Sequence, residues 1–172
     1  MSIITILLIV LVALLAGMEG VLDEFQFHQP LVACTLIGIV SGHMKEGIIL
    51  GGSLQMMALG WANVGAAIAP DAALASVASA IIMVLGLQGG ATDVNNAIST
   101  SIAVAVPLSV AGLFLTMICR TIAIPMVHFM DAAAEKGNIR MMEVWQMLAI
   151  LYVSRFLLPP CVLYLRVLLR MF

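Results

Sequence analysis

The sequence predicts an all-α membrane protein that crosses the bilayer several times. Hydrophobic residues make up 63% of its 172 residues and charged residues only 9%, whereas soluble domains have roughly 45–50% and about 25%. The mean hydropathy is +1.19. A soluble core of this chain length could not bury so much apolar surface, so the solvent of this protein is lipid. We expect residues 1–172 to form a single membrane domain.

The few charged residues mark where the helices begin and end. A helix that crosses a membrane needs about 20 mostly apolar residues. The stretches without any Asp, Glu, Lys or Arg are 1–18, 25–44, 47–70, 72–92 and 94–119. Their lengths predict a polytopic helical protein.

The first predicted span covers residues 2–22. No positively charged segment precedes its apolar run, and Glu19 and Asp23 stand where a signal peptidase would need small residues. We therefore expect a membrane helix here rather than a cleaved signal peptide.

The next three apolar segments are irregular. Residues 31–43 are too short to cross the membrane comfortably, and residues 47–69 and 72–90 are separated by Pro70 and rich in glycine and alanine. Small residues let helices in lipid approach closely, and interrupted helices in transporters surround a site near the middle of the membrane. Such backbone is tolerated where it is buried in protein or faces a watery cavity. We therefore expect short and broken helices, with candidates for re-entrant segments among them.

The second half of the chain predicts two further spans. Residues 97–119 form a strong span, and the polar stretch 131–144 is typical of an exposed loop or helix end. Residues 144–170 form the last predicted span, which Pro159 and Pro160 interrupt. Basic residues flank this last span on both sides, so the positive-inside rule leaves the orientation open.

Two carboxamides stand out within the third segment. Gln55 and Asn63 are eight positions apart. On one continuous helix this spacing leaves them about 80° apart around the axis, so both could face one cavity. Amides donate and accept hydrogen bonds, which suits the hydroxyl groups of a polar ligand. The alternative is that they form hydrogen bonds between helices.

Asp71 directly follows Pro70, at a point where a helix must end or begin. Proline is favoured just inside the start of a helix, and a carboxylate near that start interacts well with the helix dipole. Asp71 is therefore either a helix-start residue or a ligand-binding carboxylate near the two amides.

A second polar cluster lies at the end of the first span. Glu19 and Asp23 could be merely interfacial, whereas Glu24 stands just before Phe25 at the start of a further apolar run. A carboxylate can accept hydrogen bonds from two neighbouring hydroxyls of a sugar. Because ionisable groups inside a membrane are costly and usually functional, we expect Glu24 to matter more than Glu19 for sugar handling. His28 could bind ligand, cap a helix or bond a carbonyl.

Several function classes are disfavoured by the residues. The net charge is −2 and there is no basic stretch, so nucleic acid is not an expected partner. The cysteines Cys34, Cys119 and Cys161 fit no metal-ligand or disulfide spacing and are interpreted as small buried residues. The glycine-bearing segment 89–96 lacks the lysine of a phosphate-binding loop. We expect no cofactor, no metal and no enzyme activity in this chain.

Two long stretches carry a family resemblance. LDEFQFHQPLVACTLIGIVSG and GGSLQMMALGWANVGAAIAPDAALAS, residues 22–42 and 51–76, closely resemble the IIC subunit of mannose-family permeases of the bacterial phosphotransferase system. The resemblance runs from about residue 3 to about residue 165. Residues 154–172 follow the family only loosely, and family subunits are longer. We therefore expect the chain to correspond to the N-terminal two-thirds of such a permease, without its C-terminal helices.

The resemblance implies a function and partners. Permeases of this family take up hexoses such as mannose and glucose across the bacterial inner membrane, as multi-pass proteins. The IIC subunit works with a second membrane subunit, IID, in a trimer of IIC–IID pairs. Soluble IIA and IIB domains relay phosphate through their own histidines, and IIB phosphorylates the entering sugar. Several family members also serve as bacteriocin receptors.

The resemblance also implies where the sugar binds. The substrate-binding residues that it implies are the acidic pair Asp23 and Glu24, together with Gln55, Asn63 and Asp71. It argues against phosphorylation of His28, because the phosphohistidines of the family lie on the soluble domains. The alternative function is a truncated, non-transporting membrane assembly or receptor subunit, which the shorter chain favours.

Overall fold

A computed structural model describes residues 3–22, 25–61, 69–90, 93–150 and 152. These residues contain helices and turns and no strand, which confirms the all-α prediction. The labelled helices are α1 (Ile3–Leu22), α2 (Pro30–Ser41), α3 (Met44–Met57), α4 (Ala72–Gln88) and α5 (Val94–Glu135). Residues 139–150 are also helical.

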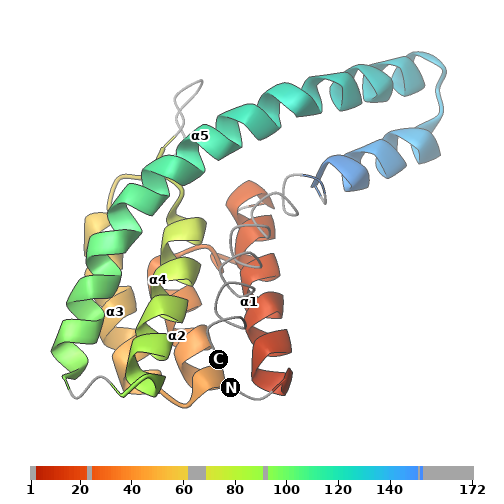
Figure 1. Cartoon of the computed structure of the whole chain (residues 1–172). Coiled ribbons are helices and arrows are strands. Elements are labelled where there is room, and N and C mark those ends of the chain that lie inside the picture. Colours follow the sequence, from red (N-terminus) through yellow and green to blue (C-terminus); the bar gives the residue numbers. More distant parts are fainter. Residues whose placement is uncertain (1–2, 23–24, 62–68, 91–92, 151, 153–172) are drawn as a thin grey trace.

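The helices α1 to α4 stand side by side as a bundle (Figure 1). The helix α5 starts at the lower end of this bundle, runs along α4 and α3, bends over the upper end and continues beyond it. The helix of residues 139–150 folds back beneath the far part of α5. Within the described residues, α5 is the helix long and apolar enough to cross a membrane by itself, and α2 and α4 are shorter apolar helices.

Three predicted segments match observed helices. The first span, residues 2–22, is α1, and the short segment 31–43 is the 12-residue α2. Pro30 occupies the start of α2, and Gly42 ends it in a left-handed conformation with φ 81°, which glycine adopts without strain. The segment 72–90 is α4.

The predicted segment 47–69 does not form one continuous helix. The helix α3 ends at Met57, and the next turn contains Gly60 with φ 89°. A left-handed residue cannot continue a right-handed helix. Gln55 and Asn63 therefore do not share one continuous helix, so the expected angle between them does not apply. Asn63 lies outside the described residues.

The prediction for residues 97–144 is also corrected. A single 42-residue helix, α5, contains the expected span 97–119, continues through Pro107 and Pro125, and ends at Glu135, so that residues 131–135 of the polar stretch form a helix end, one of its two interpretations. Neighbouring protein can satisfy the backbone groups that such prolines leave free, and the alanines after Asp131 favour helix. The connection shrinks to residues 136–138 before the next helix begins. That helix contains the start of the predicted span 144–170; most of this span lies outside the described residues.

Close packing of α2 on α3 depends on glycine. A Cβ atom at Gly47 would lie 2.6 Å from the carbonyl oxygen of Cys34, and Gly38 faces the Cα of Gly47 in the same contact. The side chain of Cys34 is fully buried there, and Cys119 is buried on α5. These two cysteines are small buried residues as predicted, whereas Cys161 lies outside the described residues.

Candidate functional site

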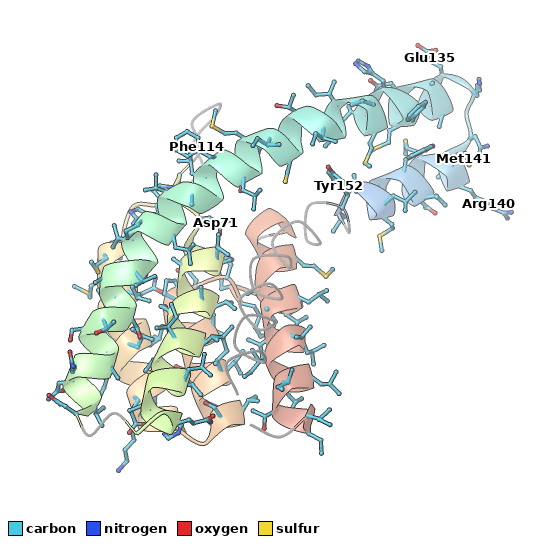
Figure 2. All side chains as sticks on the ribbon, in the orientation of Figure 1. Asp71, Phe114, Glu135, Arg140, Met141 and Tyr152 are labelled. Carbon is cyan, nitrogen blue, oxygen red and sulfur yellow. The ribbon has the colours of Figure 1, made fainter. Side chains whose placement is uncertain are left out.

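Polar groups from four parts of the chain gather at one end of the bundle. They come from the turn before α2, the end of α3, the start of α4 and the middle of α5. Figure 2 shows Asp71 at the upper end of α4, next to α5. Two of the predicted site residues, Gln55 and Asp71, belong to this end of the bundle.

Gln55 connects α3 to the start of α2. Its Nε2 atom donates to Oε1 of Gln29 at 2.7 Å, and its Oε1 atom accepts the backbone N–H of Leu31 at 3.3 Å. The side chain of Gln29 does not cap its own helix, so Gln55 satisfies one of the free N–H groups at that helix start. The structure therefore contains the interhelical hydrogen bonds that were one of the two interpretations of Gln55.

The amide chain continues toward the turn before α2. Nε2 of Gln29 donates to Oε1 of Gln26 at 2.9 Å and lies 3.4 Å from Nε2 of His28. Sequence reasoning did not single out Gln29. Its position directly before Pro30, at a helix start, is the signal that could have identified it.

Asp71 is the N-cap residue of α4. Its Oδ1 atom accepts the backbone N–H of Leu74 at 3.0 Å, which confirms the helix-start interpretation. Its own backbone N–H donates to the carbonyl oxygen of Ser109 on α5 at 3.0 Å. Thr116 on α5 and His28 are both near enough to influence the carboxyl group electrostatically. The carboxyl of Asp71 thus has partners on α4, on α5 and in the turn before α2.

An apolar recess lies at the same end of the bundle. It is shallow, with enclosed space for only about one water molecule. Its lining residues come from the starts of α2 and α4, the end of α3 and α5, and they are Pro30, Leu54, Met57, Ala58, Trp61, Ala72, Ala75, Ala105 and Val106. Ligand sites are commonly apolar with a few placed polar groups. Two of the lining residues, Pro30 and Ala72, directly follow Gln29 and Asp71 in the sequence.

The remaining predicted site residues are not placed. Asp23, Glu24 and Asn63 lie outside the described residues, and the side chain of Glu19 does too. Among the residues that the structure does describe, no group of three or more His, Cys, Asp and Glu side chains could hold a metal ion. The structure therefore unites Gln55 and Asp71 at one end of the bundle and leaves the acidic pair as a prediction.

Comparisons with known proteins give the family. The family model described as the PTS system sorbose-specific IIC component matches residues 3–169. This match includes most of the segment after residue 154 that we expected to follow the family only loosely. The chain is 54% identical over 134 residues to the PTS system mannose-specific EIIC component of Escherichia coli (strain K12), covering 78% of this chain and 47% of that protein.

Other relatives differ in the sugar that they are named for. The fructose permease IIC component of Bacillus subtilis (strain 168) is 45% identical over 163 residues, which cover 94% of this chain and 58% of the relative. The sorbose-specific EIIC component of Klebsiella pneumoniae is 46% identical over 143 residues, covering 83% of this chain and 51% of the relative. The chain thus spans about half the length of the curated relatives that it matches.

A solved structure has the same fold. It is a cryo-EM structure of the mannose transporter ManYZ in complex with microcin E492, with a TM-score of 0.86 and 46% sequence identity. The similarity covers 95% of this chain and 62% of that one. The protein is therefore a membrane protein, and it belongs to the family of IIC components of the mannose and sorbose class of the phosphotransferase system.

Proposed function

We propose that this chain binds and translocates a hexose of the mannose or glucose class as the IIC subunit of a phosphotransferase system. It works with a IID subunit, and a IIB domain that receives phosphate from IIA phosphorylates the entering sugar. The chain itself carries transport rather than phosphoryl transfer. The proposed assembly is a trimer of IIC–IID pairs in the inner membrane of a bacterium.

The observation that carries this proposal is the position of Asp71. Asp71 and Gln55 directly adjoin Ala72 and Leu54, which line an apolar recess, and both make hydrogen bonds at this end of the bundle. A hexose presents hydroxyl groups at its edge and C–H groups on its faces. Carboxylates and amides are suitable partners for the hydroxyls, and the apolar residues around the mouth of the shallow recess, Trp61 among them, are suitable for the C–H face. We extend the site to Asp23, Glu24 and Asn63 on the family resemblance.

The test compares two aspartates that each cap the N-terminus of a helix. Asp71 caps α4 and Asp93 caps α5, each accepting a backbone N–H at 3.0 Å, but Asp93 lies in the exposed connection at the other end of α4. We expect Asp71→Asn to raise the KM for mannose roughly tenfold, the size of a lost hydrogen bond to a charged group, and Asp93→Asn to leave it unchanged.

The measurement is uptake of labelled mannose. The natural reading frame that contains this chain is expressed with a IID subunit in cells that lack their own mannose permease but retain the soluble phosphocarriers. An equal KM for Asp71→Asn and Asp93→Asn would contradict the proposed site.

A second candidate function is a membrane assembly or receptor subunit without transport. The similar structure in which a mannose transporter is bound to microcin E492 favours a receptor role for bacteriocins. In that case the chain would assemble with IID and sensitise cells to the bacteriocin, while labelled mannose would stay outside. Sensitivity and uptake measured on the same cells distinguish the two functions.

A further inference from the structure

The middle of α5 lies in direct contact with Asp71 because residue 112 has no side chain. A Cβ atom at Gly112 would lie 2.6 Å from Cβ and 3.4 Å from Cγ of Asp71, and 3.0 Å from Cδ2 of Leu74. A carbon–carbon separation of 2.6 Å is well inside the optimal range of about 3.5–4.0 Å. Any larger residue at 112 must therefore push α5 away from the first turn of α4.

Three residues on one face of α5 hold three different parts of Asp71. Ser109, Gly112 and Thr116 are spaced at i, i+3 and i+7, which aligns them along one side of a helix. The carbonyl of Ser109 accepts the backbone N–H of Asp71, Gly112 lies against its Cβ, and Thr116, one turn farther along, is near enough to act on its carboxyl. Figure 2 shows Asp71 at this junction between α4 and α5.

These contacts go beyond what an N-cap residue needs. The Leu74 N–H bond alone satisfies the helix start, and Asp93 caps α5 with such a bond to Asn95. An ionised carboxyl has about four acceptor positions. Because the Leu74 N–H uses one of these positions and Gly112 lies against Cβ and Cγ of Asp71, the two contacts fix which acceptor positions of the carboxyl are left for a ligand.

We propose that Gly112 and Thr116 are positioning residues of the hexose site, which hold the Asp71 carboxyl in the orientation that accepts sugar hydroxyls. The inference rests on the proposed function, because it takes Asp71 as a hexose ligand. A ligand group that is held in its binding orientation before the sugar arrives costs less ordering on binding. Loss of either contact therefore weakens hexose binding without removing the carboxylate.

The first variant removes only a hydroxyl. Thr116→Val keeps the shape of the side chain, Thr116→Ser restores the hydroxyl, and Thr121→Val is the matched control. Thr121 lies on the same helix, is exposed, and gives its hydroxyl to the carbonyl of Met117 in its own helix at 3.0 Å. We expect Thr116→Val to raise the KM for mannose roughly fivefold at unchanged maximal uptake, with normal KM in the other two variants.

The second variant adds one methyl group at the contact. Gly112→Ala is paired with Gly52→Ala, because a Cβ atom at Gly52 of α3 meets nothing within 4 Å. We expect a higher KM for Gly112→Ala and an unchanged KM for Gly52→Ala. If Gly112→Ala does not reach the membrane in folded form, the Thr116 series still decides the question.

The uptake assay is the one that tests Asp71, and the melting temperature of the purified IIC–IID complex is measured for every variant. A raised KM for Thr116→Val with rescue by serine and an unchanged melting temperature supports the positioning role. An unchanged KM for Thr116→Val, with or without a lower melting temperature, overturns the positioning role. If Asp71→Asn still raises the KM in that case, the proposed hexose site itself is supported. An unchanged KM for Asp71→Asn overturns both proposals.

Discussion

Single polar side chains in this protein join helices that are distant in the sequence. Gln55 accepts a hydrogen bond from the backbone of Leu31, 24 residues earlier, and donates to the side chain of Gln29. Asp71 similarly connects the start of α4 to Ser109 of α5. In lipid no water is available to replace such bonds. One residue can therefore support the fold and also present a polar group to a ligand.

At the residue scale, Gln55 is predicted to contribute to stability. Gln55→Ala leaves the Leu31 N–H without its partner and removes the bond to Gln29, so we expect a loss of about 1–3 kcal/mol in the free energy of unfolding. The measurement is thermal unfolding of the detergent-solubilised protein. Ser53→Ala is the control on the same helix, because the hydroxyl of Ser53 donates to the carbonyl of Ile49 within its own helix. Equal melting temperatures for the two variants would contradict the prediction.

The sequence identified site residues where the local pattern was sufficient. The order Pro70–Asp71 before an apolar run predicted a helix start, and Asp71 is the N-cap residue there. The partners of Gln55 and the contact at Gly112 were not predictable, because they depend on which helices become neighbours in space. The expected pairing of Gln55 with Asn63 assumed an unbroken helix, and the left-handed Gly60 interrupts it.

At the scale of elements, helix boundaries were predictable where a local sequence signal marks them. The bounds of α1, α2 and α4 were predictable because charged residues, prolines or turn glycines delimit each of them. The full length of α5 was not, because the predicted span stopped before Arg120 and the stretch 131–144 was interpreted as a loop or a helix end, whereas the helix continues through Pro107 and Pro125 to Glu135. A proline costs a helix about 3 kcal/mol in water, whereas neighbouring helices and local adjustments in a membrane protein compensate for it.

Two glycines on α3 give an element-scale prediction. A Cβ atom added at Gly47 would lie 2.6 Å from the carbonyl oxygen of Cys34, whereas a Cβ atom added at Gly52 would meet no atom within 4 Å. We expect Gly47→Ala to destabilise the protein by about 1–3 kcal/mol through overpacking, and Gly52→Ala to be neutral or slightly stabilising because alanine favours helix. Thermal unfolding of both variants checks this, and a Gly47→Ala protein as stable as Gly52→Ala would refute the packing argument.

The molecule as a whole leaves much of its apolar surface uncovered. The 42 residues of α5 are about 60 Å long, twice the roughly 30 Å of bilayer hydrocarbon. Apolar side chains beyond the bundle, such as Phe114, Ile118 and Ile122, are exposed. The stacked rings of Phe129 and Trp145 hold the helix of residues 139–150 against the far part of α5. This extended part of the chain has little support from the bundle.

We therefore predict that the 172-residue chain does not transport sugar alone. Unsatisfied backbone groups cost several kcal/mol each in lipid, so irregular segments need protein neighbours, and we expect IID to supply them. The measurement is uptake of labelled mannose in cells without their own permease, by the chain alone, with IID, and with IID plus the remaining helices of a family IIC subunit as a separate fragment. We expect uptake to increase in that order. Robust uptake by the chain alone would refute the need for a partner.

The lengths of α2 and α3 determine how deep the polar end of their hairpin lies. These helices have 12 and 14 residues, so the hairpin is only about 20 Å tall. Its connecting turn precedes the exposed Lys45 and the half-buried Glu46, charges that belong at a water-facing boundary. With that end fixed there, the opposite end with Gln29 and Gln55 stops about 10 Å short of the other boundary of the hydrocarbon. In that placement the two amides lie about 10 Å inside the hydrocarbon rather than at its surface, so a polar molecule could reach them only by a path lined with protein.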